Sequence, residues 1–201
     1  MIRAVIFDLG GVYFTNGTTL AIRKFSKVLG VPEKKLLQLF NPMDGYALEY
    51  RTGRMSRDDF WGNVTRALNV KYSDYEKLEN IWKNSYRPLV GMQSIVNQVR
   101  KRYKVALLSG NVPEVAEYMK KKYRLSKHFD VCVFSFEVGF NKNHPKMFND
   151  VLKKLNVRAD ECLFIDDKKT YTETARKLGI RTVKFSSVRE LKKRLRQIGV
   201  L

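Results

Sequence analysis

The most informative part of the chain is Ala4-Val5-Ile6-Phe7-Asp8-Leu9-Gly10-Gly11-Val12. Its apolar run is short and continuous, as expected for a strand that is buried on both faces of a parallel sheet. The run ends in an aspartate, and two glycines then allow the backbone to turn. Open α/β sheets bind ligands at the carboxyl ends of their strands, so Asp8 stands where a carboxylate can hold a metal or attack an electrophile. An Asp-x-Gly-Gly sequence is also ordinary turn chemistry, and only the rest of the chain decides between the two interpretations.

Four further strand-like runs follow, at 104–109, 131–135, 162–166 and 181–185. Helical patterns separate them and close the chain, over about 91–103, 113–124, 145–156, 170–179 and 187–198. Pro113 suits the first turn of its helix, and Gly179 suits the end of another. The alternation predicts an α/β fold with a doubly wound, five-stranded parallel sheet and right-handed crossovers.

Residues 15–88 contain no convincing strand pattern. Helical periodicity covers them instead, at 18–29, 33–40, 45–51, 56–69 and 73–85. Ser56 predicts a helix start, because it is an N-cap residue followed by an acidic first turn. We therefore expect a core of residues 1–14 and 89–201 and a helical cap of residues 15–88. A cap inserted there would cover the carboxyl edge of the sheet, exclude water and shape a pocket.

Polar residues follow four of the predicted strands, and these ends converge on one edge of a parallel sheet. They are Asp8, Ser109-Gly110-Asn111, Gly139-Phe140-Asn141-Lys142 and Asp166-Asp167. Each alone has a structural alternative, such as a helix cap or a solvated lysine. Together they supply the parts for phosphoryl transfer, since aspartates hold Mg²⁺ and a lysine and a hydroxyl neutralise phosphate oxygens.

These four motifs resemble those of the haloacid dehalogenase (HAD) superfamily, in the branch with a helical cap inserted after the first strand. The cap segment from Glu49 through Ser56 to Trp61 is also similar to that branch. The order of the motifs differs from that of receiver domains, in which an acidic pair comes first and a lysine last. The resemblance implies that Asp8 is the nucleophile and a Mg²⁺ ligand, and that Asp166 and Asp167 also serve the metal. It implies that Lys142 is a catalytic residue. The residues that it implies for phosphate binding are Ser109, Gly110, Asn111 and Lys142.

Two positions depart from the family pattern. Asn143 replaces the usual proline, and Gly10 replaces the second aspartate that phosphatases use as general acid and base. The Gly10 carbonyl can still bind the metal, but proton transfer worth about 10²–10⁴ in rate is missing. A phosphatase with a better leaving group or a substitute acid remains open, with His144, Glu49 and Tyr46 as candidates. Two alternatives are a dehalogenase, whose halide leaves unprotonated but which in this superfamily needs no Mg²⁺, and a catalytically weak or inactive anion-binding protein with a basic partner surface.

The chain is strongly basic, with a net charge of +19 over 201 residues. Residues 89–201 hold 25 basic and 11 acidic residues, against 14 and 9 in residues 1–88. The basic clusters lie on separate predicted helices, so solvated helix faces are the preferred interpretation, and nucleic acid is the less favoured one. Without a membrane-length apolar run or a signal-peptide pattern, a cytoplasmic protein is expected, with Cys132 and Cys162 as reduced core residues.

The sequence does not identify the substrate beyond a small phosphorylated metabolite, and it leaves the oligomeric state open. Specificity should come from cap residues that face the sheet edge. Tyr46, Glu49, Tyr50 and Arg54 are the candidates for that role.

Overall fold

The computed structural model describes residues 1–71 and 73–201, together with the backbone of residue 72. Its strands are β1 (Ala4–Asp8), β2 (Lys104–Ser109), β3 (Val131–Phe134), β4 (Cys162–Asp166) and β5 (Arg181–Lys184). They form one parallel sheet in the order β3-β2-β1-β4-β5. The predicted five-stranded parallel sheet is confirmed, and β1, which carries Asp8, is its central strand.

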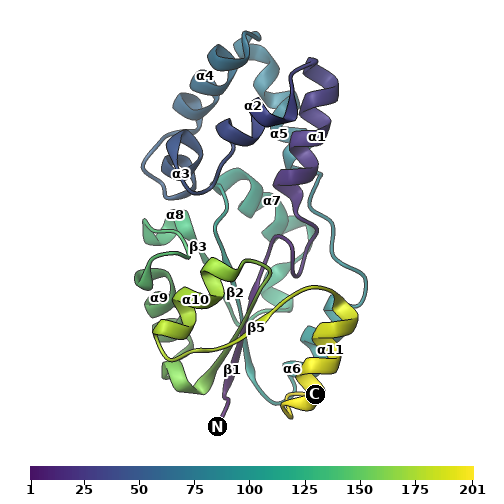
Figure 1. Ribbon diagram of the computed structural model, residues 1–201, viewed down its shortest axis with the longest axis vertical. Coiled ribbons are helices and arrows are strands. Elements are labelled where there is room, and N and C mark those ends of the chain that lie inside the picture. The colour runs from purple at the N-terminus through teal and green to yellow at the C-terminus, as the bar shows by residue number, and fades with distance from the viewer.

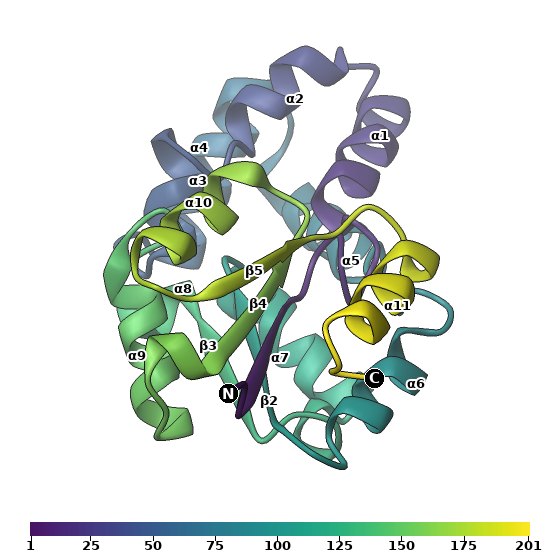
Figure 2. The ribbon, with the colours of Figure 1, turned by 60° about the horizontal axis from the view of Figure 1, so that its bottom comes forward.

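Helices cover both faces of this sheet (Figure 2). They are α6 (Met92–Val99), α7 (Pro113–Lys122), α8 (Ser135–Val138), α9 (Pro145–Leu155), α10 (Lys169–Lys177) and α11 (Val188–Gln197). Side chains alternate along a strand, so Ile6 joins an apolar core with α9 and α10, whereas Phe7 joins a second core with α6, α7 and α11. The fold is therefore doubly wound, as predicted.

The segment between β1 and α6 is helical and lies beyond the carboxyl edge of the sheet (Figure 1). Its elements are α1 (Gly17–Leu29), α2 (Glu33–Leu39), α3 (Gly45–Arg51), α4 (Arg57–Leu68), the turn η1 (Tyr72–Asp74) and α5 (Tyr75–Lys83). Phe40 and Trp82 are buried inside it, with ring centroids 5.2 Å apart. We refer to it as the cap, and the domain limits of 15–88 and of 1–14 with 89–201 stay a prediction.

The helices begin and end close to the predicted limits. Ser56 is the N-cap of α4, where its hydroxyl accepts a hydrogen bond from the Asp59 N–H at 3.1 Å. The short elements α8, η2 (Leu125–Lys127) and η3 (Ala159–Glu161) were not predicted, because three or four residues are too few for a periodic pattern. Cys132 and Cys162 are free thiols. No helix in the described part of the chain has the length and apolar character that a membrane crossing requires.

Candidate active site

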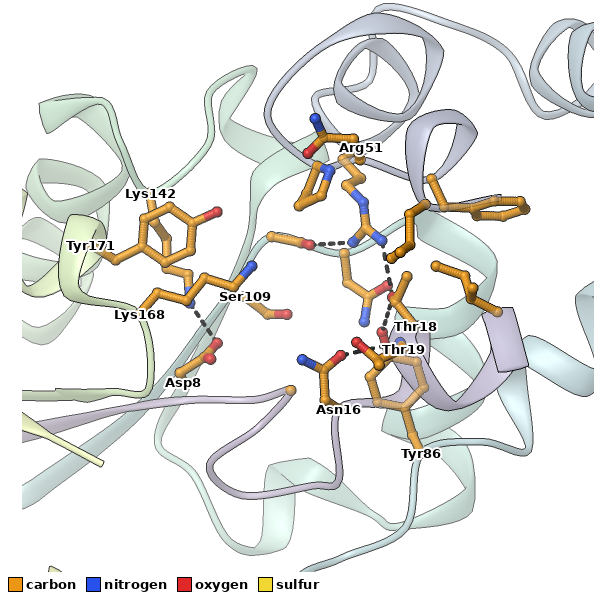
Figure 3. A pocket seen from close by; sticks show the side chains of 18 residues that line it. Asp8, Asn16, Thr18, Thr19, Arg51, Tyr86, Ser109, Lys142, Lys168 and Tyr171 are labelled. Carbon is orange, nitrogen blue, oxygen red and sulfur yellow. Dashed lines mark hydrogen bonds and ion pairs between the residues drawn. The ribbon is translucent and has the colours of Figure 1, made fainter. Parts of the chain in front are cut away.

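A cavity of about 170 Å³ lies at the junction of the sheet edge and the cap (Figure 3). Side chains of both parts line it, so neither part forms the cavity alone. The predicted site residues that line it are Asp8, Gly10, Ser109, Gly110, Asn111 and Lys142. Asp166 and Asp167 do not line the cavity but lie beside Asp8. The convergence of four strand ends that the sequence predicts is therefore present in the structure.

Asp8 is the last residue of β1, and its side chain is buried but reaches the cavity. Its Oδ1 accepts hydrogen bonds from the Leu9 N–H at 2.7 Å and from Lys142 Nζ at 2.5 Å. Its Oδ2 accepts no hydrogen bond from any described residue. One oxygen thus orients the carboxylate, and the other remains available for reaction or for a metal.

Lys142 is almost fully buried and bridges two of the carboxylates. Its Nζ donates to Asp8 Oδ1 and to Asp166 Oδ2, both at 2.5 Å. Burial by itself lowers the pKa of Lys142, but Asp166 and Asp8 outweigh this effect and hold the pKa above its ordinary value. The ammonium group is therefore protonated at neutral pH and places one positive charge beside the nucleophile candidate.

Asp8, Asp166 and Asp167 form an acidic cluster, in which one carboxylate oxygen of each lies within 4.8 Å of the others. Burial, followed by the charge of Asp166, raises the pKa of Asp8 and also that of Asp167. Asp167 Oδ1 is buried and has no hydrogen-bond partner among the described residues. Clustered carboxylate oxygens with an unsatisfied member fit a hard divalent cation such as Mg²⁺, which takes oxygen ligands.

The turn after β1 brings its backbone close to two side chains. Gly11 has φ +98°, and a Cβ there would lie 2.8 Å from Asp167 Oδ2. A Cβ on Gly10 would lie 3.3 Å from Cε1 of Tyr86. The Tyr86 ring therefore borders the space into which an aspartate at position 10 would extend. Where the usual second aspartate is replaced by Gly10, the Tyr86 ring lies beside the position of the missing side chain.

The loop after β2 is packed against the loop that carries Lys142. A Cβ on Gly110 would lie only 2.6 Å from Asn141 Oδ1, so this glycine permits the close approach. Asn141 Oδ1 in turn accepts the Lys142 N–H at 2.7 Å. The Asn111 side-chain oxygen accepts the Val112 N–H at 2.9 Å and so holds the turn into α7. The motifs after β2 and β3 thus support each other.

Several residues that the sequence did not single out also line the cavity. They are Asn16, Thr18, Thr19, Ile22, Leu37, Phe40, Asn41, Pro42, Arg51, Tyr86, Lys168 and Tyr171. Lys168 directly follows the acidic pair, so the sequence contained an indication of its place. Burial, followed by the charge of Lys142, lowers the pKa of Lys168. Arg51 lies within the cap segment that resembles the family, but no pattern distinguished it from its neighbours.

The structure does not place the expected specificity residues of the cap in this cavity, and their role stays a prediction. Tyr46, Glu49, Tyr50 and Arg54 do not line the cavity. The ring of Tyr50 stacks on Phe60 in the apolar interior of the cap, and this position directs its hydroxyl to the Glu114 carboxylate, to which it donates. Arg54 pairs with Glu49 at 3.2 Å, at the surface.

His144, one of the candidates for a substitute acid, also does not line the cavity. Its Nδ1 accepts the Lys146 N–H at 3.2 Å, and its ring stacks on Phe140. With Tyr46 and Glu49 also outside the cavity, the structure brings none of the three proposed proton donors into the site.

Residues 2–179 match the family model of the haloacid dehalogenase-like hydrolases, and the chain belongs to this family. It is 25% identical to D-ribitol-5-phosphate phosphatase of Bacteroides thetaiotaomicron, over 90% of this chain and 91% of the relative. It is 26% identical to a phosphorylated carbohydrates phosphatase of Thermotoga maritima, over 90% of this chain and 83% of that protein. The chain is therefore a hydrolase of this family.

Solved structures show the same fold. A HAD-like family hydrolase from Porphyromonas gingivalis superposes with a TM-score of 0.80 and 25% identity, over 98% of both chains. A HAD family enzyme from Bacteroides thetaiotaomicron, crystallised in complex with magnesium and inorganic phosphate, gives a TM-score of 0.79 at 23% identity, over 92% of this chain and 95% of that one.

Proposed function

We propose that this protein is a Mg²⁺-dependent phosphohydrolase that acts on a small phosphorylated metabolite through an aspartyl-phosphate on Asp8. The observation that carries the proposal is the contact of Lys142 Nζ with both Asp8 and Asp166, at 2.5 Å each, beside a cavity lined by Ser109. Nucleophile, cation, hydroxyl and acidic cluster are the groups that phosphoryl transfer requires.

In the proposed reaction, Asp8 Oδ2 attacks phosphorus, and the bond to the ester oxygen breaks with its electron pair on that oxygen, which leaves as an alkoxide or aryloxide and takes a proton from solvent. Water then attacks the aspartyl-phosphate, which releases phosphate and restores the carboxylate. Lys142, Lys168 and the Ser109 hydroxyl neutralise the phosphoryl oxygens. Asp8, Asp166, Asp167 and the Gly10 carbonyl would hold Mg²⁺, which when bound offsets the repulsion between carboxylate and phosphate.

Two comparisons support this proposal. Similar proteins are named as phosphatases of sugar-type phosphates, and a structural neighbour was crystallised with magnesium and phosphate. The acidic cluster favours the metal-dependent reaction over dehalogenation, because clustered carboxylates fit a divalent cation and dehalogenases of this superfamily need no Mg²⁺.

Turnover of p-nitrophenyl phosphate tests the proposal, with and without Mg²⁺, for the wild type and for Asp8→Asn. We expect Mg²⁺-dependent hydrolysis in the wild type and a loss of at least about 10³-fold in the variant, since the nucleophile is removed. Asp150→Asn is the control, because that side chain pairs with Lys154 on α9 and does not line the cavity. Full activity in Asp8→Asn, or no activity of the wild type on several phosphates, contradicts the proposal.

A further inference from the structure

Arg51 is a buried cation on the cap side of the cavity. It is the last residue of α3, its side chain is 3% exposed, and it lines the cavity that Asp8 also lines. Figure 3 shows Arg51 reaching in from the cap, with Asp8 and Lys142 on the other side. It enters the cavity from the cap and contacts the loop after β2 at the Gly110 carbonyl.

The guanidinium group contacts only neutral groups. It donates to the Gly110 carbonyl at 2.6 Å and to Thr18 Oγ1 at 3.1 Å, and it lies 5.4 Å above the Trp82 ring. Its Nε is buried and has no hydrogen-bond partner in the described part of the chain. Arg51 forms no salt bridge with any described residue.

The other arginines that flank it in the cap are paired. Arg57 contacts Glu79 at 2.7 Å, and Arg54 contacts Glu49 at 3.2 Å. An unpaired buried charge is costly, and burial lowers the pKa of Arg51 accordingly. A cost of this kind is typical of a functional site, where the missing countercharge arrives with a ligand.

Two cations of the core already provide positive charge for the transferred phosphoryl group, which leaves Arg51 for a second anionic group of the substrate. Lys142 lies beside Asp8, and Lys168 also lines the cavity from the core. Thr18, Asn16 and Tyr86 line the cavity as neutral groups, and Lys168, whose pKa is lowered by burial and also by the charge of Arg51, is a cation. The cap side of the cavity therefore has a positive charge and no negative one.

We infer that Arg51 selects small phosphorylated substrates that also carry a carboxylate, which the guanidinium group binds at the end opposite the phosphate. This inference rests on the proposed function and assigns its substrate class. A carboxylate matches the planar fork of an arginine, and such charge-assisted bonds are among the strong ones. The cavity of about 170 Å³ is below the ~300–1,000 Å³ of pockets for larger ligands, which favours a compact phosphorylated acid.

Two compounds with the same three-carbon skeleton test the inference. 3-Phosphoglycerate carries a carboxylate where glycerol 3-phosphate carries a CH₂OH group. We expect the wild type to have a kcat/KM at least ~10-fold higher for 3-phosphoglycerate, mainly through KM, because a hydrogen bond to a charged group is worth that much. Equal values, or a preference for glycerol 3-phosphate, overturn the inference. So does a still higher kcat/KM for glycerol 1,3-bisphosphate, which would assign a second phosphate instead.

The ratio of the two kcat/KM values is the readout for the variants, because damage to the shared catalytic groups cancels in it. Arg51→Gln is expected to bring the ratio to within ~3-fold of 1, and Arg51→Lys to retain part of it. Arg54→Gln is the matched control, because Arg54 lies in the same cap segment outside the cavity, and its ratio should equal that of the wild type. An unchanged ratio in Arg51→Gln overturns the inference and leaves Arg51 with a structural role.

Failure of the proposed function is distinguishable from failure of this inference. If the wild type hydrolyses p-nitrophenyl phosphate but neither of the two compounds, the inference fails and the proposed function stands. If it hydrolyses none of the three, the phosphatase proposal fails, and binding then decides the inference. In that case the thermal shift produced by 3-phosphoglycerate should exceed that produced by glycerol 3-phosphate in the wild type and not in Arg51→Gln. Equal shifts, or no shift, overturn the inference.

Discussion

The carboxylate of Asp8 is oriented by one oxygen and open at the other. Leu9 and Lys142 both donate to Oδ1, so the side chain cannot rotate freely, while Oδ2 has no partner among the described residues. Two positions further, Gly10 offers a backbone carbonyl but no acid. Tyr86 borders the space beside it, at 3.3 Å from the position of a Cβ. Position 10 therefore supplies no proton to the leaving group.

Gly10→Asp tests whether the missing acid limits the reaction. We expect kcat for an alkyl phosphate to rise by about 10-fold or more relative to that for p-nitrophenyl phosphate, because an alkoxide needs protonation more than a nitrophenolate does. Gly10→Ala controls for crowding against Tyr86, since it adds the same Cβ without the carboxyl. A ratio that stays the same in Gly10→Asp would argue against proton transfer as the limiting step.

The cap helices are held together by an ion-pair network under their aromatic core. Glu79 of α5 is buried and accepts hydrogen bonds from Arg57 Nε at 2.7 Å and Nη2 at 2.9 Å, and also from Lys83 Nζ. Burial raises the pKa of Glu79, but these hydrogen bonds outweigh it and hold the pKa below its ordinary value. Because α4 supplies Arg57, the network fixes the packing of α4 against α5.

Glu79→Gln should destabilise the protein by about 3 kcal/mol at pH 7, because it leaves Arg57 and Lys83 without their carboxylate partner. Because the pKa of Glu79 is lower in the folded state than in the unfolded state, its ionised form stabilises the fold. This contribution is complete at a pH above the unfolded-state pKa of 4.5, and it is lost as the pH falls through the folded-state pKa. The difference between the wild type and the variant should therefore shrink below pH 4.5 in denaturant unfolding. Glu76→Gln is the control, being an exposed glutamate on the same helix. Equal effects of the two substitutions would contradict the role of the network.

Across the whole molecule, the site exists only where the cap meets the core. Arg51 donates from the cap to the Gly110 carbonyl of the core, and Asn141 of the core donates to the Pro42 carbonyl of the cap at 2.9 Å. The acidic cluster lies just below, with Asp8 and Asp166 on neighbouring strands. A cation bound there would be linked to the stability of the folded state.

Mg²⁺ should raise the melting temperature of the wild type. At a free Mg²⁺ concentration of about 100 times Kd, binding adds roughly 2.7 kcal/mol to the free energy of unfolding. This corresponds to a rise in melting temperature of about 5–10 °C for a protein of this size. The shift should be absent in Asp166→Asn, which removes a proposed ligand, and unchanged in Asp160→Asn, which alters an exposed pair with Arg158 at 3.0 Å. A wild type that does not respond to Mg²⁺, or a full response in Asp166→Asn, would contradict the metal site.

The amino-acid sequence was sufficient for the fold and for one half of the site. Strand residues such as Val5 and Phe7 are apolar because they are buried in a parallel sheet, and this pattern is local. Ends of parallel strands must meet at one edge, so Asp8, Ser109, Lys142 and Asp166 could be brought together by topology alone.

The other half of the site was decided by the tertiary structure. Which residue of a cap helix faces the cavity depends on how that helix is rotated against the core, and Tyr50 and Arg51 are equally available in the sequence. Tyr50 is drawn into the aromatic core, where it stacks on Phe60 at 4.5 Å, and Arg51 is thereby directed to the cavity. The motifs of the sheet edge thus follow from the sequence, whereas the residues that line the cap side of the cavity follow from packing between segments distant in the chain.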